Sequence, residues 1–423
     1  MDKLAIKGGN PVINYKFKKY NTIGEEEKKA ALEVIESGIL SQFVGTWSEN
    51  FNGGPKVKLF EDACKQKFNV KHAISVNSWT SGLICAVGAL DINPGDEIIL
   101  SPWTMSACAA SILHWGAIPI FADIESTTFN IDPLSIKKNI SPNTKAILAI
   151  DIFGHSCNID AIKKIAKTHN LKIITDSAQA PGSENKGRVT GTIGDIGGFS
   201  LNYHKHIHTG EGGIVVTNND YYAERIRLIR NHAESVVQGL GVNNYANLIG
   251  YNFRLGEIES SIGIEQLKKL DSLVEKKRHN ANQLTEHLSN LKGLQLPLVR
   301  EGNLHSYYIY PLVLDLEILK TSREKIINAL KSEGVDGLMS GYVNVHLLPT
   351  FQKKIAYGSQ GFPWTYEKSR KDINYDKGIC PIAEKLHSES FLGIEICDFD
   401  LSIEDIEKIG YAFSKVWNNL NEL

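Results

Sequence analysis

Residues 197–213 read GGFSLNYHKHIHTGEGG, and they lie between two apolar runs that we expect to form strands. One lysine, Lys205, stands in the polar centre of this stretch, five residues after Ser200. A crowded or cationic neighbourhood keeps a lysine amine partly neutral, and a neutral amine can form an imine with an aldehyde. The stretch therefore indicates a covalent cofactor site at Lys205, although a lysine in a loop is usually a solvated charge.

Three histidines in the same stretch give a second interpretation. His204, His206 and His208 alternate, so they would share one face of an extended strand. Histidines at this spacing occur in zinc sites, but the intervening Lys205 and Ile207 favour neither interpretation. The choice depends on whether other groups that hold a cofactor occur elsewhere in the chain.

Composition sets broad limits on the class of protein. The chain has 423 residues, of which 42% are hydrophobic and 22% charged, as in a globular enzyme with two or three domains. The net charge of -2 gives no electrostatic reason to expect nucleic acid or an anionic membrane as a partner. No apolar run approaches the length of a membrane span, and the first residues lack a signal-peptide core, so we expect a cytoplasmic protein. Six cysteines without a CxxC pair are expected to be free, mostly buried thiols.

From His72 onward, short apolar runs alternate with helical stretches. We expect strands at 73–76, 97–100, 118–121, 146–150, 172–175, 196–200 and 213–217, and helices at 81–90, 107–115 and 160–169. This alternation predicts βαβ units and an α/β fold with a mostly parallel sheet covered on both faces. Ligands bind such sheets at the carboxyl ends of the strands.

The remaining segments predict further helices and a smaller C-terminal unit. We expect helices at 24–37, 56–68 and 221–232, and a long helix at 250–271 that continues with a bend to 291. Arg225, Arg227 and Arg230 of the helix at 221–232 are expected to face solvent or another subunit. The smaller unit has strands at 294–297 and 306–314, a helix at 321–333, a loop-rich segment at 347–380 and a closing helix at 402–421. We therefore predict a large domain, with the N-terminal segment, over residues 1–250 and a small domain over 251–423.

An acid ends one of the apolar runs. Asp176 follows residues 172–175, where a carboxylate is costly to bury unless a cation meets it. The protonated nitrogen of a pyridine ring would be such a cation. The alternative is that Asp176 caps a following helix.

A second strand end offers a place for an anion. Residues 77–82, NSWTSG, end one strand and open a helix, so their backbone N–H groups and hydroxyls suit a phosphate. Helix capping by Ser78 or Thr80 explains the same residues, and Ser200 is either a further phosphate ligand or an ordinary strand-end serine. An amine, an acid and an anion site at three strand ends are the groups that pyridoxal phosphate needs.

Taken in order, these motifs resemble the DegT/DnrJ/StrS family, the sugar aminotransferases of the fold type I pyridoxal-phosphate class. The resemblance covers nearly the whole chain, and the ordered set is specific although each piece alone is weak. The motifs are Gly8-Gly9-Asn10-Pro11-Val12, Val76-Asn77-Ser78 with Thr80, Asp176-Ser177-Ala178-Gln179-Ala180, Gly194-Asp195-Ile196-Gly197, Phe199-Ser200, Lys205 with Gly210-Glu211-Gly212-Gly213, Gly250-Tyr251-Asn252-Phe253-Arg254, and Cys380-Pro381 with Glu384.

The resemblance implies an aspartate-aminotransferase-like fold, pyridoxal 5'-phosphate as cofactor, and no metal. It implies that Lys205 bonds to the cofactor and moves a proton between cofactor and substrate. The other implied contacts are Asp176 at the pyridinium nitrogen, Gln179 beside the ring hydroxyl, Ser78, Trp79, Thr80 and Ser200 at the phosphate, Met105 against the ring, and Asn252 from the other subunit of a homodimer. His346 is implied as a substrate contact, the alternative being a satisfied surface or core histidine.

Three positions depart from the family pattern. Trp79 stands where glycine is common, so we expect its side chain to point away from the phosphate loop. Met105 replaces an aromatic residue that stacks on the ring, and its thioether would provide that contact. Asp151 replaces a frequent histidine.

The function that the resemblance implies is transfer of an amino group from glutamate or glutamine to a keto sugar, one attached to a nucleotide. A cyclitol ketone or a small phosphorylated ketone is the alternative acceptor. Some family members carry histidine at the lysine position and act as dehydratases, but Lys205 is present here. A dehydratase and a non-enzymatic scaffold remain the other interpretations.

Overall fold

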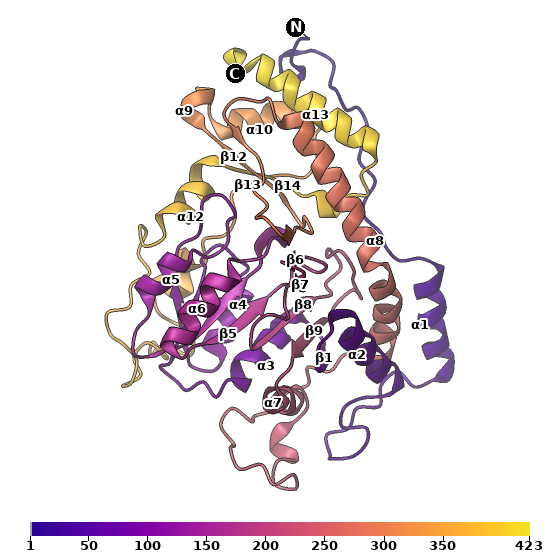
Figure 1. Cartoon of the computed structure of the whole chain (residues 1–423), viewed down its shortest axis with the longest axis vertical. Helices are drawn as coiled ribbons and strands as arrows, with labels where there is room; N and C mark the ends of the chain where they lie inside the picture. Colours follow the sequence, from indigo (N-terminus) through magenta and orange to yellow (C-terminus); the bar gives the residue numbers. More distant parts are fainter. Residues whose placement is uncertain (1) are drawn as a thin grey trace.

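A computed structural model of the chain describes residues 2–423. Its centre is a seven-stranded sheet in the order β1-β9-β8-β5-β4-β2-β3 (Figure 1). The strands are β1 (His72–Val76), β2 (Glu97–Leu100), β3 (Ile118–Phe121), β4 (Thr144–Ile150), β5 (Lys172–Asp176), β8 (Ile196–Ser200) and β9 (Gly213–Thr217). All the strands predicted between residues 73 and 217 are present, and the α/β class is confirmed.

The direction of the strands decides where the loops gather. Only β9 runs against its two neighbours, β1 and β8, and the remaining neighbouring pairs are parallel. The carboxyl ends of β1, β2, β4, β5 and β8 therefore lie along one edge, and β9 begins at the same edge. The strands are apolar without alternation, since helices cover both faces of the sheet.

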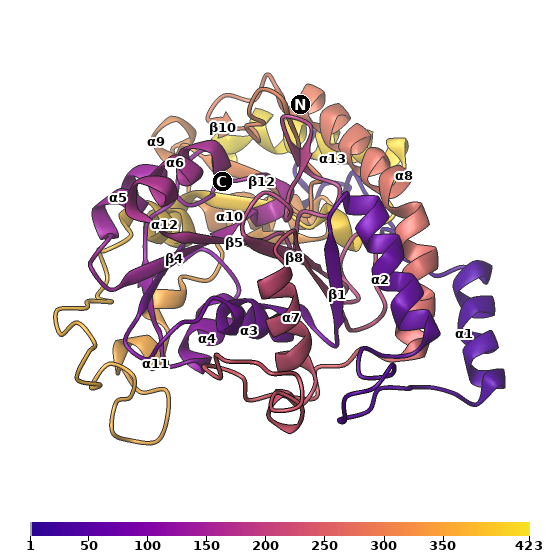
Figure 2. The ribbon, with the colours of Figure 1, turned by 60° about the horizontal axis from the view of Figure 1, so that its bottom comes forward.

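Helices cover both faces of the sheet. On one face lie α3 (Trp79–Ala89), α4 (Ala107–His114) and α7 (Asp220–Arg230), which Figure 2 shows together. On the other face lie α2 (Pro55–Phe68), α5 (Pro133–Asn139), α6 (Ile159–His169) and part of α8 (Glu257–Leu288). Phe60 and Phe68 of α2 pack there on Phe199 and Ile214 of the sheet.

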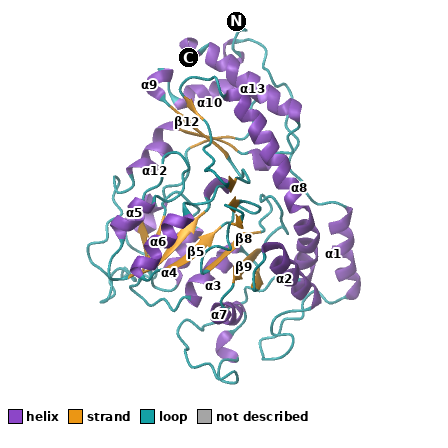
Figure 3. Ribbon diagram, viewed as in Figure 1, coloured by secondary structure: helices purple, strands orange, loops and turns teal. Residues whose placement is uncertain are grey.

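The helix α8 joins the sheet to the smaller unit. It packs on α1 (Glu25–Ser37) and α2 and, further along, on α13 (Ile403–Asn418) (Figure 1). The smaller unit holds a four-stranded antiparallel sheet in the order β10-β12-β14-β13, with α10 (Arg323–Ser332) and α13 beside it (Figure 3). Its strands are β10 (Leu294–Gln295), β12 (Tyr310–Leu314), β13 (Leu338–Ser340) and β14 (Phe391–Ile394). The boundary near residue 250 stays a prediction.

Short elements complete the chain. A small three-stranded sheet is formed by β6 (Glu184–Asn185), β7 (Arg188–Val189) and β11 (Asn303–Leu304). The remaining α-helices are α9 (Leu316–Leu319), α11 (Pro349–Gln352) and α12 (Pro381–Lys385). All six cysteines are buried and free, as predicted. Across residues 2–423, no helix combines the length and the apolar character that crossing a bilayer requires.

The predicted start of the long helix at residue 250 is wrong, because α8 begins at Glu257. Residues 250–254 run extended beside the end of α7, where the Tyr251 N–H donates to the Ile229 carbonyl at 2.8 Å. A Cβ at Gly250 would lie 2.0 Å from the backbone nitrogen of Ala233, so the two backbones pass in contact. The helix begins at Glu257 and is described as one element to Leu288.

The expectation that the arginines of α7 face solvent or another subunit is also wrong for two of them. Arg230 is 0% exposed, and it donates to Glu61 Oε1 at 2.7 Å and to the Ser75 carbonyl at 3.0 Å. Arg225 is buried too, because it donates to the Asn244 and Ala246 carbonyls of a loop that covers the helix. A buried guanidinium persists only where such partners meet it.

The Arg230 and Glu61 pair leads to a prediction about stability. Arg230→Met leaves a buried carboxylate without its cation, so the free energy of unfolding should fall by about 3–5 kcal/mol. Asp336→Asn breaks the exposed pair with Lys16, and it should cost less than about 1 kcal/mol. Urea denaturation of both variants measures the difference, and equal shifts in the midpoint would contradict the structural role given to Arg230.

Candidate active site

A cavity of 230 Å³ opens at the carboxyl edge of the sheet, where the ends of β1, β2, β5 and β8 meet. All the predicted cofactor contacts except Asn252 line it. They are Ser78, Trp79, Thr80, Met105, Asp176, Gln179, Ser200 and Lys205. The fold thus brings together side chains that are up to 127 positions apart in the sequence, counted from Ser78 to Lys205.

Lys205 presents a buried amine to this cavity. It follows β8 in a tight turn, in which its backbone N–H donates to the Asn202 carbonyl at 2.9 Å, and the residue is only 6% exposed. Its Nζ lies 4.2 Å from the centre of the Tyr308 ring. Burial lowers the pKa of Lys205 from 10.5 to about 8. Roughly a tenth of the amine is therefore neutral at pH 7, which is the form that attacks carbonyl carbon.

Asp176 presents a buried carboxylate to the same cavity. The residue is 4% exposed, and burial raises the pKa of its carboxyl group above the usual range. Its hydrogen-bond donors are all neutral: Trp79 Nε1 at 2.7 Å and the Ala178 N–H at 3.0 Å on Oδ1, and Cys108 Sγ at 3.1 Å on Oδ2. Residues 177–183 form turns, so Asp176 does not cap a following helix. It lies where a cationic ligand could neutralise it.

The Trp79 side chain lies in the core beside Asp176. It is buried, and its Nε1 donates to Asp176 Oδ1 at 2.7 Å. That it points away from a bound phosphate stays a prediction. Two glycines make room for the indole: a Cβ would lie 2.3 Å from the ring at Gly198 and 2.8 Å from it at Gly82. The sequence contains both glycines, but Gly198 lies in β8, far from Trp79 in the chain, and Gly82 lies in the next turn of α3. The pattern around Trp79 therefore does not predict the position of the indole.

The helix α3 begins at the cavity and offers backbone donors. Ser78 caps it, because the Ser78 Oγ accepts from the Ser81 N–H at 3.1 Å. The N–H groups of Trp79 and Thr80 belong to the first turn and have no partner within the helix. Together with the Ser200 hydroxyl they form a seat for an anion such as phosphate.

Gln179 connects the two parts of the molecule at the cavity. Its Oε1 accepts from the Phe153 N–H at 2.8 Å, and its Nε2 donates to the Tyr342 hydroxyl at 3.1 Å. Tyr342 and Tyr308 come from the C-terminal part of the chain and close the cavity. Sequence reasoning missed both tyrosines, since neither belongs to a local motif.

Other residues lining the cavity were also missed. They are Leu83, Thr104, Ala107, Cys108, Ile150, Ala178, Asn202, His204, Glu211 and Gly212. Of these, Glu211 had a signal in the sequence, because it lies in the opening motif among glycines. Its carboxylate accepts from Asn202 Nδ2 at 2.9 Å.

Met105 and Asp151 differ in their relation to the cavity. Met105 lines it but is 58% exposed, and its contact with a cofactor ring stays a prediction. Asp151 lies behind the cavity, where it accepts from Ser177 Oγ at 2.5 Å and from the Cys157 N–H at 2.8 Å. Burial raises the pKa of Asp151 to about 6.

Two predicted residues lie outside the cavity. His346 does not line the cavity: the side chain is 0% exposed, and its Nε2 lies 2.9 Å from Glu384 Oε1. Its ring packs beside Phe121, and its contact with substrate stays a prediction. Asn252 is exposed on the surface, and its contact with a partner subunit stays a prediction.

The three alternating histidines do not form one site. Residues 2–423 contain no group of three or more His, Cys, Asp or Glu side chains arranged to hold a metal ion. His206 is fully buried and its Nε2 lies 2.8 Å from the Ser306 carbonyl, whereas His204 lines the cavity. The turn after β8 therefore separates side chains that an extended strand would have aligned.

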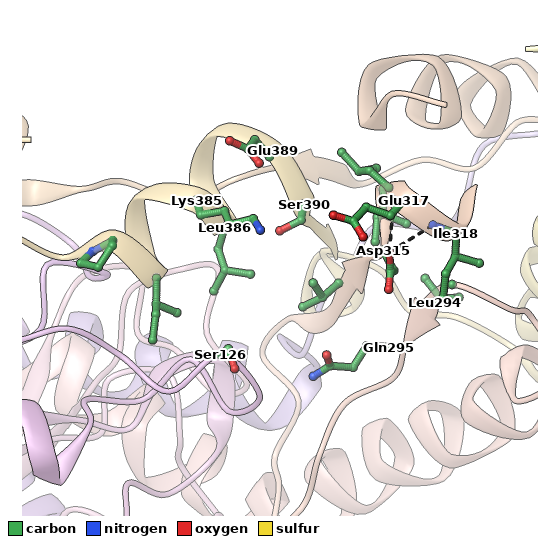
Figure 4. A pocket seen from close by; sticks show the side chains of 16 residues that line it. Ser126, Leu294, Gln295, Asp315, Glu317, Ile318, Lys385, Leu386, Glu389 and Ser390 are labelled. Atoms are coloured by element: carbon green, nitrogen blue, oxygen red, sulfur yellow. Dashed lines mark hydrogen bonds between the residues drawn. The ribbon is translucent and has the colours of Figure 1, made fainter. Parts of the chain in front are cut away.

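A larger cavity of 820 Å³ lies elsewhere, between α12 and the β10 and β12 end of the small sheet (Figure 4). It shares no lining residue with the Lys205 cavity. Its charged residues, Asp315, Glu317, Lys385 and Glu389, are all exposed, and Asp315 is engaged in capping α9. Its lining has no buried amine together with a buried acid, so we assign the catalytic site to the smaller cavity that contains Lys205.

Comparison with known proteins agrees with this geometry. The model of the DegT/DnrJ/EryC1/StrS aminotransferase family matches residues 21–389. The chain belongs to this family. The spore coat polysaccharide biosynthesis protein SpsC of Bacillus subtilis (strain 168) is 35% identical over 350 residues, which are 81% of this chain and 86% of that protein.

A second relative and a solved structure extend the comparison. GDP-perosamine synthase of Caulobacter vibrioides is 32% identical over 328 residues, covering 77% of this chain and 84% of that protein. The X-ray structure of the aminotransferase from Psychrobacter cryohalolentis matches with a TM-score of 0.82 at 27% identity, covering 96% of this chain and 100% of that one. The resemblance inferred from the motifs is thus confirmed, together with the fold type I class and the aminotransferase activity.

The environment of Lys205 leads to a prediction that this aminotransferase can test without added cofactor. Because only the neutral amine reacts, carbamylation of Lys205 by cyanate should rise with pH through a midpoint of about 8. The exposed Lys16 serves as the control for an amine that is not buried. Mass spectrometry of peptides gives both rates, and parallel curves for the two lysines would contradict the effect of burial.

Proposed function

We propose that this aminotransferase uses pyridoxal 5'-phosphate to move an amino group from glutamate or glutamine to the ketone of a nucleotide-linked sugar. The observation that carries the proposal is the pairing of one buried amine and one buried carboxylate in a single cavity, those of Lys205 and Asp176. The family uses pyridoxal phosphate, and the residues of this chain fit that group.

The fit rests on charge. Asp176 is buried with only neutral donors around its oxygens, so a cationic ring nitrogen would supply the missing partner. The N–H groups at the start of α3 and the Ser200 hydroxyl would hold the phosphate. Gln179 would meet the ring hydroxyl through its amide. Bound there, the cofactor would supply an aldehyde and an electron-accepting ring.

The residues of the chain then have separate tasks. The Lys205 amine, with its pKa near 8, can take a proton from carbon and return it at neutral pH. The Tyr308 ring lies against its Nζ and limits where the amine can point. Tyr308 and Tyr342 narrow the access of water to the cavity, which strengthens charge interactions within it.

The acceptor is proposed from the relatives. One bears the name GDP-perosamine synthase and another is named for spore coat polysaccharide biosynthesis, which supports a nucleotide-linked sugar. The presence of Lys205 in the cavity counts against the dehydratase alternative, in which histidine replaces the lysine.

We further propose that the active unit is a homodimer. Apolar side chains between 47% and 56% exposed cluster on α1 and the loop after it, namely Leu32, Ile35, Ile39, Leu40 and Trp47. Exposed apolar surface of this kind favours association. Asn252 lies outside the cavity of its own chain, which agrees with a role across an interface. The cytoplasmic location stays a prediction.

The function is tested with glutamate labelled with nitrogen-15 and a set of keto sugars linked to GDP or UDP. We expect the label in the sugar product with the wild-type protein, and at least about a thousandfold slower transfer with Lys205→Ala, because the proton carrier and cofactor anchor are lost together. A deoxygenated product without label would instead identify a dehydratase. Borohydride reduction with pyridoxal phosphate should tag the peptide that contains Lys205, and a tag on another lysine would contradict the assignment.

The dimer is tested by light scattering of the purified protein. The wild type should have twice the chain mass of 46.9 kDa, that is 93.8 kDa. Ile35→Glu combined with Trp47→Glu should shift it toward one chain mass, since charges would replace apolar contacts. Changing one exposed apolar side chain at the start of α13, Ile403→Glu, should leave the mass unchanged. A wild-type mass of one chain would overturn the dimer.

A further inference from the structure

The Asp176 carboxylate is held unequally at its two oxygens. Oδ1 accepts from two N–H groups, those of Trp79 at 2.7 Å and Ala178 at 3.0 Å. Oδ2 accepts only from the Cys108 thiol at 3.1 Å, and a thiol is a weak donor. A cationic N–H of a ligand can displace the single thiol from Oδ2 more readily than it can displace the two N–H donors from Oδ1. Oδ2 is therefore the oxygen that is available to a ligand.

We propose that Trp79 is a positioning residue, whose indole N–H holds the Asp176 carboxylate so that Oδ2 receives the ring nitrogen of the cofactor. This rests on the proposed function and adds a residue to it.

Glycines surround Trp79. Gly198 and Gly82 leave room for its indole ring, and Gly213 at the start of β9 lies against its backbone, where a Cβ would lie 2.8 Å from the Trp79 nitrogen. The ring is buried between α3 and β8 and contacts Asp176 through its only polar atom. An indole that merely filled space would not need its N–H directed at a carboxylate.

The charges around Asp176 determine what the indole N–H does. The titratable groups that act on or near this carboxylate are Lys205, Asp151, Cys108 and Tyr342. Burial favours the protonated acid, whereas a hydrogen bond from Trp79 favours the carboxylate. Without the indole N–H, Asp176 should take up a proton at higher pH, and a neutral acid no longer pairs with a cationic ring.

The test compares two changes of tryptophan to phenylalanine. Trp79→Phe removes the donor and keeps an aromatic ring, while Trp364→Phe removes another buried indole N–H, which donates to the Tyr375 hydroxyl at 2.9 Å outside the cavity. The dissociation constant of pyridoxal phosphate is measured by equilibrium dialysis from pH 5 to 9. Trp79→Phe should weaken binding about tenfold at pH 7, the size expected for a hydrogen bond to a charged group.

The pH profile separates positioning from packing. In the wild type, the affinity for pyridoxal phosphate should fall at acid pH as Asp176 takes up a proton. The midpoint of this fall, the acid limb, should lie about one pH unit higher in Trp79→Phe and be unchanged in Trp364→Phe. In Asp176→Asn the acid limb should be absent. Asp151→Asn should keep the limb, which excludes Asp151 as its source. If the wild type binds pyridoxal phosphate and Trp79→Phe behaves as Trp364→Phe does, this inference is wrong and the proposed function stands. A wild type that does not bind the cofactor at any pH overturns both.

A second measurement covers the case in which Trp79→Phe does not fold. The chain has only six tryptophans, so its indole N–H signals can be followed by NMR with nitrogen-15 in the tryptophan rings. In Asp176→Asn one indole signal should shift, and in the wild type the same signal should shift when pyridoxal phosphate is added. An indole spectrum that Asp176→Asn leaves unchanged would overturn the hydrogen bond in solution.

Discussion

A buried carboxylate at the end of a strand is the constraint on which the site depends. Asp176 ends β5, where strands on both sides exclude water, and only neutral donors reach it from the chain. Such a group is unfavourable unless hydrogen bonds or a cationic ligand compensate for the lost solvation. The arrangement is thus prepared for a cation, and the Lys205 amine in the same cavity is prepared to lose its charge. Burial acts on both groups, and it drives both toward their neutral forms.

The cavity also couples parts of the chain that could otherwise fold separately. Gln179 follows β5, yet its amide donates to Tyr342 of the C-terminal part. Tyr308, from the same part, lies over the Lys205 amine. The long helix α8 fixes the relative position of these parts, because it packs on α1 and α2 as well as on α13. The geometry of the amine therefore depends on the packing of the C-terminal part and not only on the loop that carries Lys205.

Much of the sheet could be predicted because its strands are buried on both faces. The mostly apolar runs 97–100, 118–121 and 196–200 give the observed β2, β3 and β8 without error in their bounds. The charged segments were less predictable. Arg230 is a charged residue of a type that usually lies on an exposed helix face. In the structure it is buried, because it forms an ion pair with Glu61, which is far away in the sequence. His346 likewise lies beside Glu384 in the interior, 38 positions further along the chain. In each case the decisive partner is absent from the local pattern.

The sequence by itself determined the order of strands and helices, the loop with Lys205, the acid at 176 and the family to which these belong, since each is written in a local pattern of apolar residues, glycines and polar strand ends. Only the tertiary structure decided which way the Trp79 side chain points, which tyrosines close the cavity, and that His346 lies outside it. The physical reason is that hydrogen bonds and burial depend on distances between residues remote in the chain, and a linear sequence does not contain those distances.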